Sequence, residues 1–320
     1  MSILALIHPT GLIGTELRES LERRRDLWQE MLLLTTTEEE LGTLTEVRGA
    51  AAMVTAIETN SLDGVDVAFF CGGIAESRPV VEMLPPTTAG IVLAPDAEPE
   101  DGHPIVAGVN LETATRDQIL VSPHPGTVAL AHLLYPLLPF HPRQAIATLL
   151  EPVSTHGKEG LDELFEQTRS ILTFDPNKPH NVFAGQIAFN VTPVEAAPEH
   201  LAAQLKTVLR TDLELAVHSM QAGIFHGYGV SLYVRLDDDP GAEECAQVLA
   251  EHPLNERVED PELLGPINAA GRAEVLVGAV QPDPAKRGGY WIWAVMDNLT
   301  CGGALNAVQI LEAVGHQMTH

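Results

Sequence analysis

Apolar and helical stretches alternate along the first part of the chain. Short apolar runs predict buried strands, and they cover residues 3–7, 31–34, 65–70, 90–94, 105–106 and 119–122. Between the first two runs, residues 12–25 have apolar side chains at helical spacing with charges on one side. Strands that are separated by helices are typical of a parallel sheet with crossover connections. The proline-rich residues 95–104 predict a surface loop.

Longer strands appear from about residue 145 onward. Predicted strands cover residues 145–153, 230–236, 274–281 and 290–295. Predicted helices cover residues 127–138, 158–172, 200–213, 242–251 and 304–314. This second pattern indicates an α+β arrangement with a mostly antiparallel sheet.

Composition narrows the class of protein. The formal net charge is −26, from 18 basic and 44 acidic residues, so we expect no binding to nucleic acid or to anionic membranes. Three widely spaced cysteines form no disulfide framework, which fits a reducing compartment. No apolar run has the length that a bilayer needs, and the chain begins with a strand-like run without a basic leader. We therefore expect a cytoplasmic protein.

The turn after the first predicted strand resembles a dinucleotide-binding loop. Its sequence, His-Pro-Thr-Gly-Leu-Ile-Gly, covers residues 8–14. Such a loop holds a pyrophosphate at the start of a helix, so we expect Thr10, Gly11 and Gly14 to contact a cofactor. The first glycine of the pattern is His8, and Pro9 lacks a backbone donor. An ordinary strand-turn-helix is the alternative.

The end of the second predicted strand bears on the choice of cofactor. Residues 35–40 read Thr-Thr-Thr-Glu-Glu-Glu, without lysine or arginine. Carboxylates repel a 2′-phosphate and accept hydrogen bonds from a ribose hydroxyl, so NAD is favoured over NADP, with Glu38 as the ribose ligand. Two alternatives stay open: the glutamates open the next helix, or no dinucleotide binds.

Five segments resemble the aspartate-semialdehyde dehydrogenase family, in order and across nearly the whole chain. They are HPTGLIG, DVAFFCGG, ILVSPHPGTVAL, GQIAFNVTP and DNLTCGGALNAVQI. The resemblance implies an α/β fold with two domains, a Rossmann-like parallel-sheet domain and an α+β dimerisation and catalytic domain. It assigns residues 1–125 with 301–320 to the first domain and residues 126–300 to the second, and it implies a homodimer. It also places Gly72, Gly73, Asn298 and Gly302 beside the cofactor.

The family's reaction requires a cysteine thiolate that attacks the aldehyde, a histidine as acid and base, and a nicotinamide that takes the hydride. The resemblance places the nucleophile at Pro125, which has no nucleophilic group, and the acid/base at His226. The active-site glutamine falls on Glu151, and the substrate-binding arginine falls on Ser219. His226 and Glu151 are therefore the remaining candidate catalytic residues.

Other positions also lack the residues that bind substrate and phosphate in the family. The substrate-binding glutamate and lysine fall near Leu209 and Asp212, and no arginine stands within residues 94–101 to bind phosphate. Loss of these cations removes charge complementarity for a carboxylate and a phosphate. We expect a divergent, Usg-like homologue without the catalytic cysteine, in which the standard dehydrogenase activity is lost.

Histidines suggest a second function. His124, His156 and His226 map to the family's active-site turns together with Glu151. Imidazoles and a carboxylate are suitable zinc ligands, and an open metal position activates water for hydrolysis. No HxH or HExxH spacing accompanies these residues, and a histidine in a cleft is usually hydrogen-bonded instead.

Cysteines suggest a third function, redox chemistry through another thiol. Cys71 and Cys301 map beside the cofactor, and Cys301 precedes a helix start that lowers a thiol pKa. Small buried residues that pack near the sheet are the favoured interpretation of both.

Overall fold

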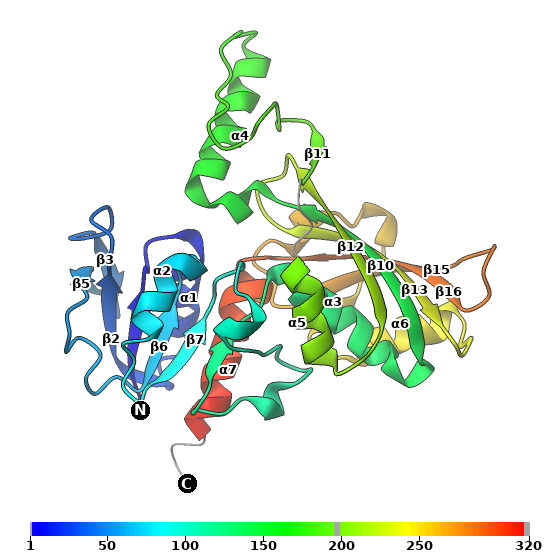
Figure 1. Cartoon of the computed structure of the whole chain (residues 1–320). Helices are drawn as coiled ribbons and strands as arrows, with labels where there is room; N and C mark the ends of the chain where they lie inside the picture. Colours follow the sequence, from blue (N-terminus) through cyan, green and yellow to red (C-terminus); the bar gives the residue numbers. More distant parts are fainter. Residues whose placement is uncertain (1, 195–198, 317–320) are drawn as a thin grey trace. The chain divides into compact units, whose positions relative to one another are not determined.

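A computed structural model describes residues 2–194 and 199–316. The chain divides into two compact units (Figure 1). Unit 1 contains Met1–Val128, Ala203–Leu209 and Gly302–His320, and unit 2 contains Ala129–Ala202 and Arg210–Cys301. Residues 203–209 were expected in the second domain, and residues 317–320 lie outside the described residues. In the described ranges, no helix has the length and apolarity needed to cross a membrane.

Unit 1 contains a parallel sheet, as the alternation of strands and helices predicts. Its order is β5-β2-β1-β6-β7-β9-β8, and every neighbouring pair runs parallel. The strands are β1 (Ser2–Ile7), β2 (Trp28–Thr35), β5 (Thr55–Ala56), β6 (Val67–Phe70), β7 (Ala89–Val92), β8 (His103–Pro104) and β9 (Ile119–Val121). Leu4, Ala5, Leu6 and Ile7 are fully buried. Both faces of the sheet are therefore covered, which is typical of parallel sheets.

Helices cover the two faces of this sheet. Helices α1 (Leu12–Arg23) and α7 (Asn306–His316) pack on the face that carries Leu4 and Leu6. Helix α2 (Ile74–Val81) packs on the face that carries Ala5 and Ile7. A hairpin of β3 (Leu44–Val47) and β4 (Ala50–Met53), which the apolar pattern did not predict, follows β2.

Two predicted helices end earlier than the sequence suggests. Helix α3 (Pro125–Leu134) passes into a 3₁₀ helix, Tyr135–Phe140, because Pro136 disfavours an α-helical residue before it. Helix α5 (Glu199–Leu209) ends before Arg210, whose φ of 50° is left-handed. The following residues form β12 (Glu214–Ala222), a strand that the sequence pattern did not predict.

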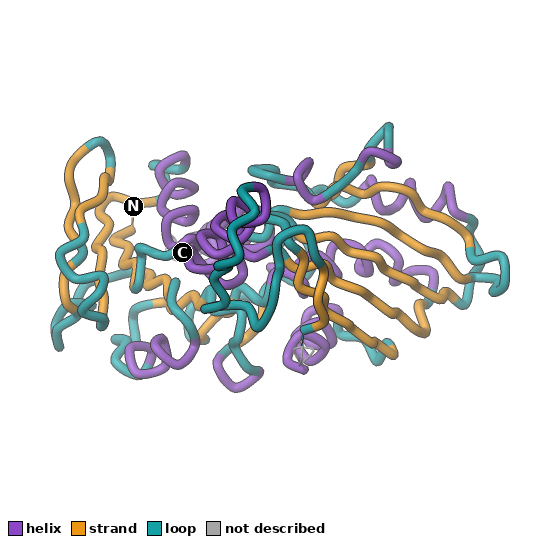
Figure 2. Tube along the Cα trace, turned by 90° about the horizontal axis from the view of Figure 1, so that it is seen from above, coloured by secondary structure: helices purple, strands orange, loops and turns teal. Residues whose placement is uncertain are grey.

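Unit 2 contains a second sheet, and the prediction of a mostly antiparallel α+β unit is confirmed. Its order is β11-β12-β10-β13-β16-β15-β14, and only β10 with β12 and β14 with β15 run parallel. The other strands are β10 (Pro142–Glu151), β11 (Val191–Pro193), β13 (Tyr228–Leu236), β14 (Asn255–Arg257), β15 (Val275–Pro282) and β16 (Gly289–Met296). Figure 2 shows the long strands of this sheet side by side, in orange.

The two faces of this sheet differ. On the inner face Ala145, Ala147 and Leu149 are fully buried, and helix α6 (Ala242–Glu251) buries Cys245 and Leu249. On the outer face Ile146, Tyr233 and Trp291 are neighbours across β10, β13 and β16. Ile146 is 42% and Trp291 46% exposed, and the rings of Tyr233 and Trp291 lie 4.9 Å apart. We call these three residues the open-face row.

Helix α4 (Gly157–Leu172) extends away from the unit 2 sheet together with the segment that follows it (Figure 1). A small core of Val153, Leu164, Ile187 and Ala188 joins them. A short 3₁₀ helix, Val153–His156, connects α4 to β10. Unit 2 thus contains the sheet with α6 packed on it and the extension that is formed by α4 and the segment after it.

Candidate functional site

The turn between β1 and α1 has the backbone of a glycine loop. His8 takes the left-handed conformation, with φ of 56°, at the position of the loop's first glycine. Gly11 is the N-cap of α1. A Cβ atom on Gly14 would lie 2.6 Å from the Pro9 carbonyl oxygen, so the close packing of helix on loop requires glycine there. The residues after β1 thus form a tight strand-turn-helix, and the binding of a cofactor there stays a prediction.

A carboxylate of the chain itself lies in this loop. The backbone nitrogen of Thr10 donates a hydrogen bond to Glu40 Oε1 at 3.2 Å, and the Thr10 hydroxyl donates to the same oxygen. The Thr35 hydroxyl donates to Glu40 Oε2 at 2.6 Å, and His8 Nδ1 lies 3.1 Å from that oxygen. Burial alone raises the pKa of Glu40, but the hydrogen bonds from His8, Thr10 and Thr35 lower it to about 2.

Glu38, the predicted ribose ligand, is exposed, whereas the side chain of Glu40 is only 14% exposed. The His8 ring fills the space beside Glu40, where its Nε2 lies 3.1 Å from the Thr36 hydroxyl. A Cβ atom on Gly72 would lie 3.0 Å from this ring. Glu40 is thus the member of the acidic run that contacts the loop, and the predicted role of Glu38 as a ribose ligand stays a prediction. The predicted preference for NAD over NADP stays a prediction.

The second helix at this sheet edge also receives a carboxylate. Gly73 is the N-cap of α2, and the Ile74 backbone nitrogen donates to Asp96 Oδ1 at 3.1 Å. Gly302, which was also predicted to contact a cofactor, is buried in a π-helical turn, Thr300–Leu305, before α7. Two of the predicted cofactor positions, Thr10 and Gly73, thus lie beside a carboxylate of the chain.

Pro125, where the resemblance places the family's nucleophile, is the first residue of α3. His124 Nδ1 accepts a hydrogen bond from the Gly126 backbone nitrogen at 3.0 Å. Gln204 Oε1 accepts from the His124 backbone nitrogen at 3.2 Å and from the Thr127 hydroxyl at 3.0 Å. Gln204, which sequence reasoning missed, is a buried polar residue among the apolar positions of α5. This network fixes the helix start.

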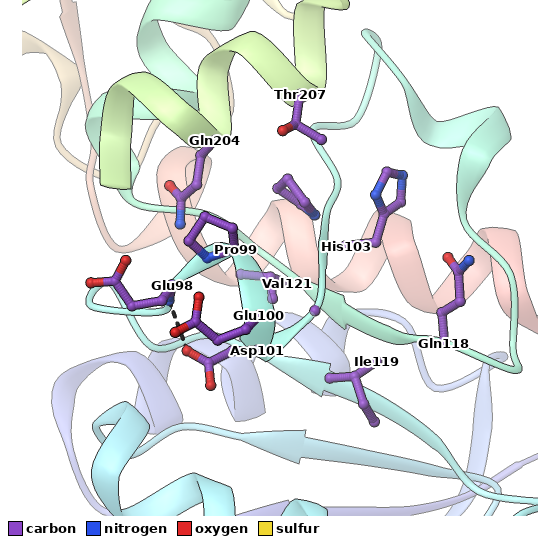
Figure 3. Close-up of a pocket in the computed structure, with 12 residues that line it drawn as sticks. Glu98, Pro99, Glu100, Asp101, His103, Gln118, Ile119, Val121, Gln204 and Thr207 are labelled. Atoms are coloured by element: carbon purple, nitrogen blue, oxygen red, sulfur yellow. Dashed lines mark hydrogen bonds between the residues drawn. The ribbon is translucent and has the colours of Figure 1, made fainter. Parts of the chain in front are cut away.

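Unit 1 also contains a hollow of about 460 Å³ that includes none of the predicted residues (Figure 3). The carboxylates of Glu98, Glu100 and Asp101 lie together on one part of its wall. Arg78 binds Asp101 through two nitrogens at 2.7 and 3.0 Å. Three carboxylates against one arginine repel phosphate groups, so this hollow does not suit a dinucleotide.

In unit 2, Glu151 and His156 are joined by a residue that the sequence did not reveal. Gln221 Nε2 donates to the Glu151 carbonyl oxygen at 3.0 Å, and Gln221 Oε1 lies 3.0 Å from His156 Nε2. An amide oxygen only accepts, so the His156 proton resides on Nε2. Gln221 is buried on β12, a strand whose outer face is polar.

Glu151 is itself a buried carboxyl. Burial raises its pKa, and the nearby Ser219 hydroxyl and His156 ring only partly offset this effect. The pKa of Tyr228 is raised well above its usual value by burial and by the Glu151 charge. Tyr228, two positions after His226, is therefore a buried hydroxyl within reach of the Glu151 charge. A protonated Glu151 can donate as well as accept a hydrogen bond.

Asn298, which was predicted to contact a cofactor, holds two turns of unit 2 together. Its Oδ1 atom accepts from the Gly227 backbone nitrogen at 3.0 Å, and its Nδ2 atom donates to the Ser154 hydroxyl at 3.1 Å. His226 lies in the same region, and its Nδ1 atom is buried without a hydrogen-bond partner among the residues that the structure describes. The predicted role of Asn298 beside a cofactor stays a prediction.

The predicted metal site receives no support. Across residues 2–194 and 199–316, no three His, Cys, Asp or Glu side chains gather so that they could hold a metal ion. His124 and His156 each use a ring nitrogen in a hydrogen bond, which removes that nitrogen from coordination.

All three cysteines are buried and unpaired. Burial is the main cause that raises the pKa of each thiol, to about 12 for Cys245 and further for Cys71 and Cys301. A thiolate at Cys301, which the sequence suggested, is therefore disfavoured.

Known proteins resemble this chain over nearly its full length. A family model for the semialdehyde dehydrogenase dimerisation domain matches residues 134–301. The aspartate-semialdehyde dehydrogenase of Rickettsia conorii is 26% identical over 97% of this chain and 96% of that protein. The USG-1 protein homolog of Azotobacter vinelandii is 31% identical, with the same coverage of 97% and 96%.

Solved structures show the same likeness. A probable aspartate-semialdehyde dehydrogenase from Pseudomonas aeruginosa has a TM-score of 0.89 and 28% identity, over 97% of each chain. Aspartate semialdehyde dehydrogenase II from Vibrio cholerae, in complex with ASA, has a TM-score of 0.89 and 25% identity. That alignment covers 99% of this chain and 98% of the other.

Proposed function

The chain belongs to the semialdehyde dehydrogenase family, and from this premise we propose that it has kept the fold of the family and lost the dehydrogenase reaction. The observation that carries the proposal is Pro125 at the start of α3. Oxidation of an aldehyde by this route requires a nucleophile that adds to the carbonyl carbon, so that loss of hydride to the nicotinamide leaves an acyl-enzyme, and the proline ring has no such group.

No neighbouring group offers a replacement for the nucleophile. The Thr127 hydroxyl donates to Gln204, and the Ser122 hydroxyl accepts from Asn306 Nδ2 at 2.9 Å. Neither hydroxyl is paired with a base in these contacts, which an activated nucleophile needs. The three cysteines are buried with raised pKa values, so they supply no thiolate at neutral pH.

Substrate binding is altered as well. Ser219 stands where the resemblance places the substrate-binding arginine, and Glu151 is its neighbour. A site without the arginine and with a carboxyl beside it offers poor complementarity to a substrate carboxylate. These features support a role through binding, with a ligand other than the family substrate. The metal-dependent alternative has no observation in its favour.

We propose a homodimer in the cytoplasm. The matched family model is a dimerisation domain, and the open-face row leaves aromatic surface exposed on the unit 2 sheet. Exposed aromatic and aliphatic side chains that form one row are typical of an interface. Three free thiols suit a reducing compartment.

A direct assay tests the loss of activity. The purified protein is mixed with aspartate semialdehyde, phosphate and NAD or NADP, and nicotinamide reduction is followed by absorbance. Aspartate semialdehyde dehydrogenase II of Vibrio cholerae serves as the active control. We expect no reduction above the background without protein. Any turnover by the wild type would overturn the proposal. This holds whether the turnover survives in the double variant Cys71→Ala/Cys301→Ala or is abolished by it.

A further inference from the structure

A dinucleotide that binds a glycine loop places its pyrophosphate against the backbone nitrogens at the start of the first helix. In this chain Glu40 already accepts from the Thr10 backbone nitrogen at 3.2 Å and from the Thr10 hydroxyl. We propose that Glu40 is a built-in anion that takes the phosphate position and closes the loop to dinucleotides. The residues present therefore do not fit the cofactor that the fold implies.

The geometry of Glu40 is that of a bound anion. One carboxylate oxygen accepts from Thr10, and the other accepts from the Thr35 hydroxyl at 2.6 Å. His8 Nδ1 lies 3.1 Å from the second oxygen, and because a carboxylate only accepts, the ring proton resides on that nitrogen. The carboxylate is thus held on both oxygens by groups from the ends of β1 and β2.

The His8 ring adds bulk where the loop's first glycine would leave space. The ring is buried, with 4% of the residue exposed, and it packs so close to Gly72 that a Cβ atom there would lie 3.0 Å away. Glycines are used in such loops because the backbone must approach the pyrophosphate closely. His8 and Glu40 together therefore fill the place of the ligand.

Asp96 provides an independent observation at the neighbouring helix. Its carboxylate accepts from the Ile74 backbone nitrogen at 3.1 Å, at the start of α2. Both α1 and α2 start at the edge of the sheet where β1 and β6 end (Figure 1). The starts of α1 and α2 thus each have a carboxylate of the chain beside them, and these carboxylates repel phosphate oxygens.

Closure by Glu40 persists at neutral pH. The pKa of Glu40 is about 2, so the carboxylate is ionised and keeps its hydrogen bonds. Glu38 and Glu39, the preceding glutamates, are exposed, and neither is among the groups that hold Glu40. They are therefore suitable sites for control substitutions.

The test measures binding of ADP and NAD by calorimetry to the full-length protein and to Glu40→Ala, with Glu39→Ala as the matched control. ADP is used because it carries the pyrophosphate without the nicotinamide. We expect no binding to the wild type or to Glu39→Ala. Glu40→Ala, or His8→Gly/Glu40→Ala where the ring also blocks entry, gains affinity of at least about tenfold over the wild type.

Two results would overturn the proposal. One is wild-type binding of ADP as tight as binding to Glu40→Ala. The other is absence of ADP binding in both opened variants when circular dichroism shows that they are folded. If neither Glu40→Ala nor His8→Gly/Glu40→Ala folds, the wild type is titrated with ADP and the amide resonance of Thr10 is followed. A saturable shift of this resonance would contradict the closed loop, and an unchanged resonance supports it.

The test of the closed loop is separate from the test of the lost reaction, because calorimetry measures binding of ADP and not turnover. A wild-type protein that binds ADP and remains inactive would contradict the closed loop alone. Dehydrogenase activity of the wild type would contradict the proposed function as well.

Discussion

Glu163 and Gln167 stand one helical turn apart on α4, and both side chains hold the segment that follows the helix. Glu163 accepts from the backbone nitrogens of Asn181 and Val182, each at 2.7 Å. Gln167 accepts from the Ile187 backbone nitrogen at 2.8 Å and donates to Glu163 at 3.1 Å. Both side chains are buried, so their polar groups replace water for this segment.

We predict that Glu163→Gln destabilises the protein. The substitution turns an amide group toward backbone N–H donors, and each buried donor without an acceptor costs about 1–3 kcal/mol. Urea unfolding should show this loss, and limited proteolysis should cut residues 179–188 faster. Glu166→Gln removes a surface carboxylate that bonds Arg169 and should change the free energy of unfolding by less than about 1 kcal/mol. Equal effects of both substitutions would contradict the prediction.

Glu40 should make stability depend on pH in the acid range. Its pKa in the folded protein is about 2, below the value of 4.5 for a free glutamate, so its stabilisation is present above pH 4.5 and is lost as the pH falls toward 2. After allowance for solvent screening, we expect Glu40→Gln to cost about 1–2 kcal/mol at pH 7. Urea unfolding at a series of pH values from 7 downward measures the free energy of unfolding of the wild type and of Glu40→Gln. The curves of wild type and variant should converge in acid, while Glu39→Gln should follow the wild type throughout.

Thiol labelling tests the chemistry of the α3 start. Native wild type should not react with a thiol reagent, because Cys71, Cys245 and Cys301 are buried and their pKa values are raised. Pro125→Cys should add one fast-reacting thiol, since residue 125 is partly exposed at a helix N-terminus that lowers a thiol pKa. The unfolded wild type should label at all three positions. Rapid labelling of the native wild type would show that a thiol is available.

Asn298 should contribute to stability as the link between two turns. Asn298→Ala leaves the buried Gly227 nitrogen without its acceptor and removes the bond to Ser154, so we expect a loss of roughly 2–3 kcal/mol. Ser154→Ala removes only the second bond and should cost about 1 kcal/mol. Denaturant unfolding compares them. A smaller loss in Asn298→Ala than in Ser154→Ala would show that the Gly227 contact is unimportant.

The open-face row should determine the oligomeric state. Trp291→Glu places a charge in the proposed interface, where its burial without a partner is unfavourable, so we expect monomers. Sedimentation velocity measures the mass, and circular dichroism checks the fold. Leu263→Glu changes a residue that is 80% exposed elsewhere in unit 2 and should stay dimeric. Dimers of Trp291→Glu would place the interface on another surface.

The fold was predictable where a segment shows one clear hydrophobic pattern. Buried strands such as residues 67–70 are apolar on both faces, and the sequence showed them directly. Strand β12 was missed because its outer residues, Glu214 and His218, are polar and follow a helix without a break in composition. The break occurs at Arg210, whose left-handed backbone is a property of the tertiary structure and not of the residue type.

The site was only partly predictable. The glycine loop has a local signature, so the turn with Gly11 and Gly14 could be located from the sequence alone. The choice of Glu40 over Glu38 depends on how the chain turns after β2, and three adjacent glutamates give no signal for this. Gln221 was missed for a related reason, since its role depends on the pairing of β12 with β10, which is far away in sequence.

The open-face row also has a consequence through symmetry. In a dimer with a two-fold axis the same patch is used on both protomers, so each substitution in the row is present twice in one interface. The change in association free energy for a single substitution then contains two equal contributions. The monomer–dimer equilibrium would respond to Trp291 variants more steeply than the stability of either folded protomer does.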